Sequence, residues 1–581
     1  MAQFLGMFNA DAPYALKGIY DAPYRMCARH ALCGWGAAEQ EGILALAAGW
    51  MRNVSALRKE LKACGRPLRG DESVSMLLLH AYRQWGEECI ERIEGAALCV
   101  VIDRENGRLL LATDRMGEAG GVYYSVQGAQ VAFAGHPEPI LSAPWVSRAV
   151  DEDGWREIFG LGPAHTVGKT PFRDIRQLQS GYVLTADRQG QYLRRYFKLK
   201  TKEHTEGERE TVEHVRELIE RAVEDVMRFK PSAMLSGGLD STALCALMSR
   251  RSSEPLHTFS VDYEGSVEHF HGNEYQIERD APYVEAAVRE LGCRHTQLTV
   301  GTEELLGALD AAMIARGRPG MADIDSSLLI FSRRIAREER CVVSGECGDE
   351  VFGGYPWFHR EALIERDCFP WSGSLALRER ILKKSVAREL RLEEYVIERW
   401  QEAMAHQVVL EGESPREKRL RRLQGVCFEY FMTNLQERAS AMGQAAGLTV
   451  LTPLCDERLA EYVYNVPWHM KNMGGMEKGL FREAMRGIVP EAILYRKKSP
   501  YPKTHHPEYT SGVIRRMAQI LNDPHSPILQ IIDRQAVEAL MQSDLPPAAT
   551  PWFGQLMTGA QMLAYLIQVN AWMLRYRVEP M

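Results

Sequence analysis

Apolar positions change their spacing along this chain, and the changes mark out its parts. In roughly the first 195 residues, short apolar runs such as 97–102, 109–112 and 131–134 alternate with Gly and Asn/Asp turns. Apolar runs of this length between turn residues predict β-strands, so the first part is expected to be rich in strands. The polar and charged stretch 198–209 that follows is the expected linker.

Helical spacing opens the second part, and strands and helices then alternate. Apolar residues recur at helical spacing from Val212 to Val226, which predicts a helix. The expected strands that follow are 233–235, 257–261, 297–300 and 341–343, and the expected helices between them are 242–249 and 281–291. This alternation predicts a parallel sheet covered by helices, with ligands beyond the carboxyl ends of the strands. The loops after Leu235, Val261 and Val343 are therefore expected to share one crevice, and the chain beyond residue 361 is expected to be mostly helical.

Composition and charge narrow the classes of partner. A chain of 581 residues should form more than one domain, because single cores stop growing near ~250–300 residues. The net charge of -7 and the pI near 6.2 argue against a nucleic-acid partner. No apolar run reaches the ~18–20 residues of a membrane span, and the N-terminus lacks a secretory pattern, so no membrane partner is expected. Twelve scattered cysteines without a C-x-x-C pair predict reduced thiols, a cytoplasmic location and no zinc site.

The run 236–241, Ser-Gly-Gly-Leu-Asp-Ser, is the first candidate site, between an expected strand and an expected helix. Gly237 and Gly238 let a ligand approach the backbone, and N–H groups at a helix start bind anions. The carboxylate of Asp240 can hold Mg²⁺ beside phosphates. No Gly-Lys-Ser/Thr follows, so this is not a Walker motif, and the run resembles the pyrophosphate loop of ATP pyrophosphatases. A turn without a ligand stays open as the alternative for so short a motif.

A second and more specific candidate is the segment 344–355. It places the carboxylates of Glu346, Asp349 and Glu350 and four glycines directly after an expected strand. Three isolated carboxylates cannot all be buried without partners. A solvated acidic loop is the plain alternative, and the functional one is a site for Mg²⁺ and for a base near an incoming amine.

This segment resembles the S-G-E-G-S-D-E-x-x-G-G-Y signature of the glutamine-dependent asparagine synthetases. Four further stretches match one bacterial branch of the family in the same order, namely 320–327, 477–479, 494–503 and 551–557. The resemblance covers essentially the whole chain and implies an α/β fold. Residues 1–197 would form an N-terminal Ntn-hydrolase-like αββα sandwich, similar to a type 2 glutamine amidotransferase domain. Residues 210–581 would form a C-terminal ATP-pyrophosphatase (adenine nucleotide α-hydrolase-like) domain, with a parallel sheet and a helical C-terminal part.

The resemblance also implies roles for the residues of both loops, with ATP and Mg²⁺ as cofactors. In the family a carboxylate attacks the α-phosphate of ATP, an acyl-adenylate and pyrophosphate form, and an amine attacks the acyl carbon. The matching catalytic residues are Glu346, as a base, and Lys498, as the pyrophosphate lysine. The matching metal ligands are Asp240 and Asp349. The residues matched to ATP and pyrophosphate contacts are Ser236, Gly237, Gly238, Asp240, Ser241, Val261, Ser344 and Gly345.

The N-terminal part departs from the family where the glutaminase residues should stand. Ala2 takes the place of the family's nucleophilic cysteine and carries no nucleophile. Ala48 matches the asparagine of the family's Asn-Gly pair, and Val74 matches its glutamine-binding aspartate. The Arg-Asp-Arg-x-Gly motif survives only as 113–117, Thr-Asp-Arg-Met-Gly. Several losses in one pocket predict a degenerate domain without glutaminase activity.

The synthetase part departs in the segment 437–454. The branch pattern there is D-R-K-D-R-M-S-M-A-T-G-L-E-V-R-V-P-F, and its charged positions have become Ala439, Ser440, Ala441, Thr449 and Leu451. The lost charges belonged either to structural ion pairs, whose replacement by apolar packing is often neutral, or to a substrate pocket or ammonia tunnel. A changed pocket or a closed tunnel is slightly favoured, because a chain without glutaminase needs no tunnel.

Three classes of function compete on the sequence. The leading one is an AMP-forming amide synthetase, a carbon–nitrogen ligase that joins a small-molecule or peptide carboxylate to ammonia or an amine. A natural-product cyclase of the lasso-peptide or β-lactam type is one version of it. A non-catalytic ATP-binding paralogue is the second class, disfavoured by the intact Asp240, Glu346, Asp349 and Lys498. Nucleotide or tRNA modification fits the first loop but not the later motifs, and a homodimer is one option for the oligomeric state.

Overall fold

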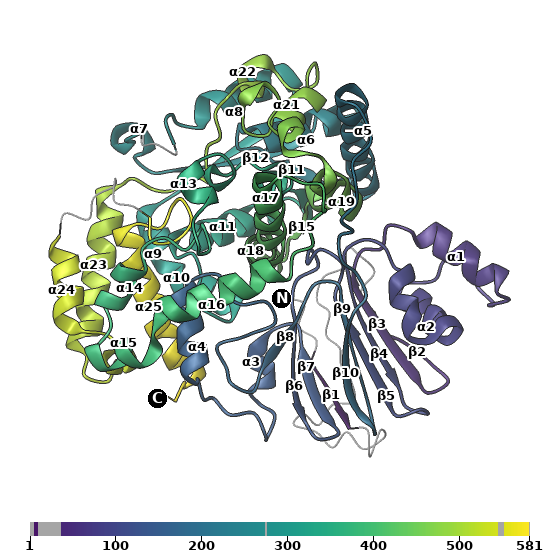
Figure 1. Cartoon of the computed structure of the whole chain (residues 1–581), viewed down its shortest axis with the longest axis horizontal. Coiled ribbons are helices and arrows are strands. Elements are labelled where there is room, and N and C mark those ends of the chain that lie inside the picture. The colour runs from purple at the N-terminus through teal and green to yellow at the C-terminus, as the bar shows by residue number, and fades with distance from the viewer. Residues whose placement is uncertain (1–4, 10–35, 273–275, 544–550, 580–581) are drawn as a thin grey trace. The chain divides into compact units, whose positions relative to one another are not determined.

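The computed structural model describes residues 5–9, 36–272, 276–543 and 551–579, and the chain forms two compact units (Figure 1). The first comprises Met1–Ala149 and Val167–Lys198, and the second comprises Val150–Thr166 and Leu199–Met581. Ala2 lies outside the described residues. Across the described ranges, no helix combines the length and the apolar character that a membrane crossing requires.

The first unit is built from two antiparallel sheets, with strand orders β1-β7-β6-β8 and β10-β9-β5-β4-β3-β2. Its strands are β1 (Leu5–Asn9), β2 (Ala38–Gln40), β3 (Ile43–Gly49), β4 (Ala97–Asp103), β5 (Arg108–Ala112), β6 (Val122–Gln127), β7 (Gln130–Ala134), β8 (Arg176–Leu178), β9 (Tyr182–Asp187) and β10 (Gly190–Arg195). Helices α1 (Val54–Ala63) and α2 (Val74–Trp85) pack on the larger sheet, and α3 (Pro137–Ile140) packs on β6 and β7.

Strand β4 shows how the layers of the first unit pack on one another. Successive side chains of a strand point to opposite faces of its sheet. Cys99 and Val101 lie in the core that the larger sheet shares with α1 and α2. Leu98, Val100 and Ile102 lie in the core between the two sheets. The strand is therefore buried on both faces, and the expected αββα sandwich is confirmed.

A five-stranded parallel sheet of order β13-β12-β11-β14-β15 forms the centre of the second unit. Its strands are β11 (Ser232–Met234), β12 (His257–Tyr263), β13 (Arg294–Val300), β14 (Cys341–Val343) and β15 (Thr449–Leu451). The first four confirm the expected strands, whereas β15 was not expected from the sequence. The strand order reverses between β11 and β14, and such a reversal opens a crevice at the carboxyl ends of the strands.

Helices surround this sheet and form most of the described chain beyond residue 361, as expected. The helices up to that point are α5 (Glu208–Met227), α6 (Leu239–Ser249), α7 (Ser266–His269), α8 (Ala281–Leu291), α9 (Thr302–Gly307), α10 (Leu309–Arg316), α11 (Asp323–Ile335) and α12 (Gly348–Phe352). Those beyond it are α13 (Glu361–Ile364), α14 (Leu375–Arg380), α15 (Lys384–Leu390), α16 (Leu392–Ala405), α17 (Pro415–Val426), α18 (Thr433–Ala446), α19 (Glu457–Asn465), α20 (Trp468–Lys471), α21 (Gly479–Ala484), α22 (Glu491–Leu494), α23 (Pro507–Asn522), α24 (Arg534–Gln542) and α25 (Gly559–Tyr576). Phe259 of β12, Phe331 of α11 and Met442 of α18 share one buried cluster against the sheet.

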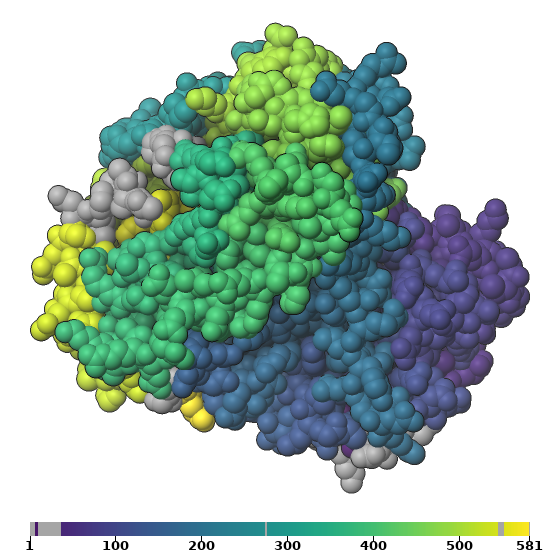
Figure 2. Space-filling model, viewed as in Figure 1, coloured from purple at the N-terminus to yellow at the C-terminus, as the bar shows by residue number. Residues whose placement is uncertain are grey.

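Segments far apart in sequence lie side by side within the second unit. Leu382 pairs with Ile532 in an isolated antiparallel bridge, and the N–H of Lys383 donates to the carbonyl of Ile531 at 2.9 Å. Helix α15 therefore lies beside α24 and its neighbours, where green and yellow surfaces meet in Figure 2.

The segment Val150–Thr166 belongs to the second unit although strands of the first unit flank it in sequence. It holds α4 (Glu152–Arg156) and the π-helical turn η2 (Glu157–Leu161). The buried carboxylate of Glu157 accepts the N–H of Thr166 at 2.7 Å and the hydroxyl of Tyr395 on α16 at 2.5 Å. The hydroxyl of Tyr565 donates to the carbonyl of Ile158 at 2.8 Å. These bonds satisfy buried polar groups that would otherwise be costly, and they tie the segment to helices of the second unit.

Candidate active site

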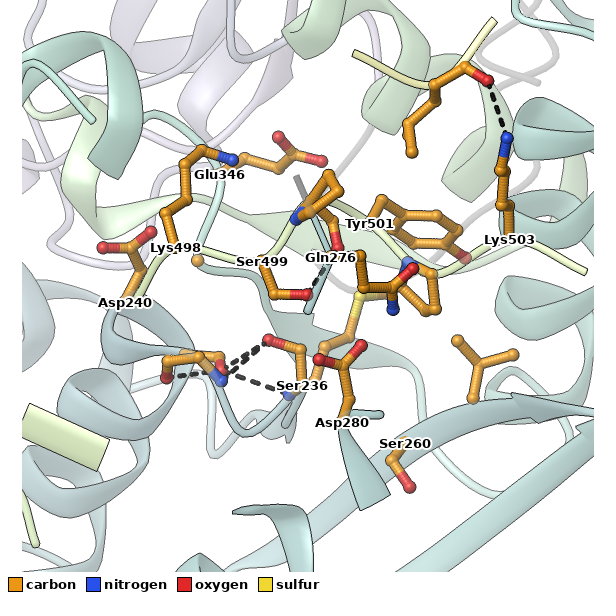
Figure 3. Close-up of a pocket in the computed structure, with 18 of the residues that line it drawn as sticks. Ser236, Asp240, Ser260, Gln276, Asp280, Glu346, Lys498, Ser499, Tyr501 and Lys503 are labelled. Atoms are coloured by element: carbon orange, nitrogen blue, oxygen red, sulfur yellow. Dashed lines mark hydrogen bonds between the residues drawn. The ribbon is translucent and has the colours of Figure 1, made fainter. Parts of the chain in front are cut away.

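A pocket of about 270 Å³ lies at the carboxyl ends of β11, β12 and β14 (Figure 3). The loops after these three strands all line it, which confirms that they share one crevice. Gly237 is not among the lining residues, and its carbonyl accepts a hydrogen bond from Arg496 at 2.9 Å. The sequence-predicted site residues that line the pocket are Ser236, Gly238, Asp240, Ser241, Val261, Ser344, Gly345, Glu346, Asp349 and Lys498.

The loop 236–241 is held by its own serines. The hydroxyl oxygen of Ser241 accepts the N–H of Ser236 at 3.1 Å, and the two hydroxyls lie 3.0 Å apart. Helix α6 begins after Gly238 without a side-chain cap, and the residues of its first turn line the pocket. Because uncapped N–H groups at a helix start bind anions, this end of the pocket can hold phosphate oxygens.

Glycines bring the loop close to its neighbours. Gly237 has a φ of +68°, and a Cβ there would lie 2.8 Å from the backbone nitrogen of Val284. A Cβ at Gly345 would lie 2.9 Å from the backbone nitrogen of Ser241. The loop therefore packs between α8 and the segment after β14, backbone against backbone, and larger residues would move it.

Two carboxylates and two lysines meet beside this loop. The Nζ of Lys478 lies 2.5 Å from a carboxylate oxygen of Asp240 and 2.5 Å from one of Asp349. The Nζ of Lys498 lies 3.1 Å from Asp349. Lys478 precedes α21 with a φ of +57°, a conformation that non-glycine residues adopt rarely and that occurs more often at active sites. Sequence reasoning matched the stretch 477–479 to the family but predicted no contact for Lys478, because Asp240 and Asp349 lie far from it in the chain.

Burial and charge together set the ionisation of this cluster. Burial favours the neutral form of Asp349, but Lys478 and Lys498 outweigh it, and the pKa of Asp349 falls below its ordinary value. Asp240 and Asp349 in turn raise the pKa of Lys478 although the lysine is buried. Lys478 therefore stays charged near neutral pH, next to the loop 236–241.

Glu346 meets an arginine on the other side of the pocket. Its Oε1 accepts a hydrogen bond from the Nη2 of Arg438 on α18 at 2.9 Å. Arg438 is buried and lines the pocket. Sequence reasoning did not single out Arg438 as a site residue, because it lies far from Glu346 in the chain and local patterns do not pair the two.

Glu350 plays a structural part and does not line the pocket. It is 1% exposed and accepts the hydroxyl of Tyr355 at 2.6 Å. Burial and the neighbouring charge of Asp349 raise the pKa of Glu350 to about 8. The interpretation of 344–355 as a solvated acidic loop is therefore wrong, because each of its carboxylates has a partner in the fold.

The segment 437–454 mixes retained and lost charges. Glu437 pairs with Arg318 at 2.8 Å, so this position keeps a buried ion pair. Of the five described positions that lost a charge, Ala439 lines the pocket and the other four do not. This distribution favours a changed pocket at Ala439 and, at the other four positions, replacement of charged by uncharged side chains outside the pocket.

Comparison with known proteins shows which family the chain belongs to. The Asparagine synthase family matches residues 214–574, and the Glutamine amidotransferase domain family matches residues 37–197. The chain belongs to the asparagine synthetase family. "Asparagine synthetase [glutamine-hydrolyzing] 3" of Bacillus subtilis (strain 168) is 38% identical over 537 residues, which cover 91% of this chain and 87% of that protein. "Asparagine synthetase [glutamine-hydrolyzing] 1" of the same organism is 24% identical over 495 residues, which cover 78% and 74%.

Membership of the asparagine synthetase family makes the chain an ATP-dependent carbon–nitrogen ligase. The resemblance and the enzyme class expected from the sequence are therefore confirmed. Among solved structures, glutamine phosphoribosylpyrophosphate amidotransferase from B. subtilis, complexed with ADP and GMP, aligns with 10% identity and a TM-score of 0.22. The alignment covers 49% of this chain and 76% of that one, and it adds nothing to the fold argument.

In the amidotransferase-like unit, the positions altered from the family lie on well-formed elements. Ala48 lies at the end of β3, and Val74 is the first residue of α2. The backbone N–H of Ala47 donates to the hydroxyl of Ser75 at 3.0 Å, so the two altered positions adjoin one bonded pair. Asp114 accepts backbone N–H groups of residues 116–119, so its carboxylate shapes that turn.

Proposed function

We propose that this asparagine synthetase family member forms amide bonds through an acyl-adenylate and works without a glutaminase. The supporting observation is the cluster of Asp240, Asp349, Lys478 and Lys498 beside the uncapped start of α6, in the same pocket as Glu346. In this proposal, residues 210–581 perform the chemistry, and residues 1–197 form a degenerate amidotransferase-like domain.

The first step activates a carboxylic acid. One carboxylate oxygen attacks the α-phosphorus of ATP, the bond from that phosphorus to the bridging oxygen breaks, and pyrophosphate leaves. Backbone N–H groups of the loop 236–241 and the ammonium groups of Lys478 and Lys498 stabilise the charge on the departing group. Donors fixed in this way are worth roughly 10²–10³-fold in rate each.

The second step forms the amide. The nitrogen of ammonia or of an amine attacks the acyl carbon, the bond from that carbon to the AMP oxygen breaks, and AMP leaves. Glu346 accepts the proton that the nitrogen loses. Its hydrogen bond to Arg438 holds the carboxylate at the pocket wall.

The residues around Asp240 fit a magnesium ion that arrives with ATP. The Oδ1 of Asp240 is buried without a hydrogen-bond partner among the described residues, and a Cβ at Gly348 would lie 2.7 Å from it. No described group of three or more His, Cys, Asp or Glu side chains forms a metal site. Asp240 and Asp349 would hold the ion, and phosphate oxygens and water would supply its other ligands. Bound there, Mg²⁺ would neutralise phosphate charge.

The absence of glutaminase activity rests on side-chain chemistry. Ala2, Ala48 and Val74 stand where the family pattern has a nucleophile, an asparagine and a glutamine-binding aspartate. None of these three side chains can donate or accept a hydrogen bond or act as a nucleophile. The nitrogen must therefore come from a source other than glutamine hydrolysed by this chain.

A nitrogen-source assay tests this part of the proposal. With ATP, Mg²⁺ and a panel of carboxylic acids, we expect ammonium chloride or an added amine to support amide formation together with AMP and pyrophosphate. Glutamine as the sole nitrogen source should give neither amide nor glutamate. Release of glutamate above the uncatalysed background would refute the degenerate-glutaminase assignment, and ADP in place of AMP would refute the activation step.

A further inference from the structure

The pocket continues beyond Glu346 into an apolar wall. The rings of Tyr355 and Trp357 stack with their centroids 4.2 Å apart. Phe431 meets both rings edge-on, at 5.4 and 5.3 Å. Leu435 and Ala439 lie four residues apart on α18 and therefore share a face of the helix. All five line the pocket, and we call them the aromatic wall.

The aromatic wall lies close to the reacting groups. The Nζ of Lys498, the proposed pyrophosphate lysine, lies 5.0 Å from the centroid of the Tyr355 ring. The aromatic wall therefore begins next to the ammonium group of Lys498. Arg438 directly precedes Ala439 and bonds to Glu346. A molecule whose carboxylate reaches the α-phosphate therefore places its remaining atoms against this wall.

Arg438 has hydrogen-bonding capacity to spare. Its guanidinium carries five N–H donors, and Glu346 takes a bond from Nη2. Its Nη1 contacts the sulfur of Met321 at 3.9 Å, and its Nε has no hydrogen-bond partner among the described residues. A buried guanidinium with unused donors is a natural receptor for a carboxylate.

Most other cations that line the pocket already face a carboxylate of this chain. Lys478 and Lys498 hold Asp349, and the charge of Lys503 faces Asp323. The arginine pairs are Arg279 with Asp262, Arg482 with Glu477, and Arg496 with Asp280. A second carboxylate on the substrate would have to compete with these pairs, and its burial against the aromatic wall would be costly.

We propose that the acid activated here is a monocarboxylate with an apolar, ring-sized body. Arg438 binds its carboxylate beside Glu346, and the aromatic wall holds its body. This inference rests on the proposed acyl-adenylate chemistry. It also gives the loss of charge at Ala439 a function, because a charged side chain there would project into the apolar end of the pocket.

Acid-dependent exchange between ATP and labelled pyrophosphate tests the inference. Phenylacetate, hexanoate and L-aspartate are compared on the full-length chain. We expect kcat/KM for phenylacetate or hexanoate to be at least about tenfold that for aspartate, on the scale of a lost hydrophobic or charged contact. Exchange with aspartate at an equal or higher kcat/KM would overturn this inference and leave the proposed function standing. Exchange with none of the three acids would also overturn this inference, whereas the proposed function would fall only if no acid of the nitrogen-source panel gave amide, AMP and pyrophosphate.

Variants at neighbouring positions separate charge from bulk. Ala439→Lys should lower kcat/KM for the apolar acid at least about tenfold, and Ala439→Met, of similar length without charge, should lower it less. Ser440→Lys, one residue along α18 and outside the pocket lining, should leave it unchanged.

Arg438→Met should raise the KM for the acid but not for ATP, and Arg438→Lys should recover part of the loss. Equal effects of the two Ala439 variants, or a matching rise in the KM for ATP in Arg438→Met, would contradict the assignment.

Discussion

Lys478 joins two carboxylates that would otherwise repel each other and the phosphates of ATP. Its ammonium lies 2.5 Å from both Asp240 and Asp349, in a buried position where charges are screened little. The lysine therefore keeps the carboxylates together, and in the proposed reaction it supplies positive charge where pyrophosphate departs.

Lys478→Met removes that charge while keeping the length of the side chain. We expect the rate of AMP formation to fall by roughly 10²-fold or more, on the scale of one lost preorganised donor. Lys497→Met is the matched control, since Lys497 lines the same pocket and forms no ion pair with either aspartate in the described part of the chain. Steady-state AMP formation measures both, and equal losses would contradict a special role for Lys478.

Glu350 should make the stability of the chain fall with rising pH. Its pKa is about 8 in the folded chain, against an ordinary 4.5, so between these values the folded state binds the proton and the unfolded state does not. The contribution of Glu350 to the free energy of unfolding is therefore fully present below 4.5 and is lost as pH rises through about 8. Glu350→Gln still accepts the Tyr355 hydroxyl but cannot titrate. Urea unfolding across this pH range should give a flatter slope for the variant, and an unchanged slope would contradict the protonated state.

Among the elements, the loop between β11 and α6 needs glycine at position 237 for two reasons, the positive φ and the lack of space for a Cβ. Gly237 and Gly292 both have positive φ, +68° and +64°, but only at Gly237 would a Cβ meet other atoms, among them the Cβ of Tyr283 at 2.8 Å. Gly292→Ala should cost about 1–2 kcal/mol from backbone strain alone. Gly237→Ala should cost more and raise the KM for ATP at least about tenfold, because the loop must move. Urea unfolding and ATP kinetics measure the two effects, and an unchanged KM for ATP would contradict the close packing.

Elements with a local apolar pattern could be predicted from the sequence. The ranges 281–291 and 341–343 match α8 and β14 residue for residue, because the first shows helical spacing and the second is an apolar run directly before Ser-Gly. Strand β15 was not predicted, because its strand conformation depends on pairing with β14, which lies far earlier in the chain. The transfer of 150–166 to the second unit could not be predicted either, because it depends on Glu157 meeting Tyr395, more than two hundred residues away.

The candidate site shows the same division between local and distant signals. Its loops could be predicted, since glycines and carboxylates after a strand are a local pattern. The contacts of Lys478 and Arg438 could not, because both residues reach the pocket from segments far away in the chain, and a family match of those segments does not identify their contacts. The five lost charges of the segment 437–454 could be seen in the sequence, but only the fold separates Ala439, on the pocket wall, from the other four.

Taken whole, the molecule keeps the fold of an amidotransferase-like unit whose family chemistry we propose it has lost. This is physically reasonable, because the two cores of that unit consist of apolar side chains on α1, α2 and the sheets. Ala48 belongs to the core between the sheets, so this position now contributes to apolar packing. The reaction of the whole chain is then decided in the second unit alone.

Isotope transfer tests the acyl-adenylate most directly. An acid that supports pyrophosphate exchange, labelled with ¹⁸O in both carboxylate oxygens, is turned over to amide with unlabelled ATP, and the AMP is analysed by mass spectrometry. Because the attacking carboxylate oxygen stays on phosphorus when the amine displaces AMP, we predict one ¹⁸O atom in each AMP formed. AMP without label, or label in phosphate accompanied by ADP, would contradict activation through an acyl-adenylate.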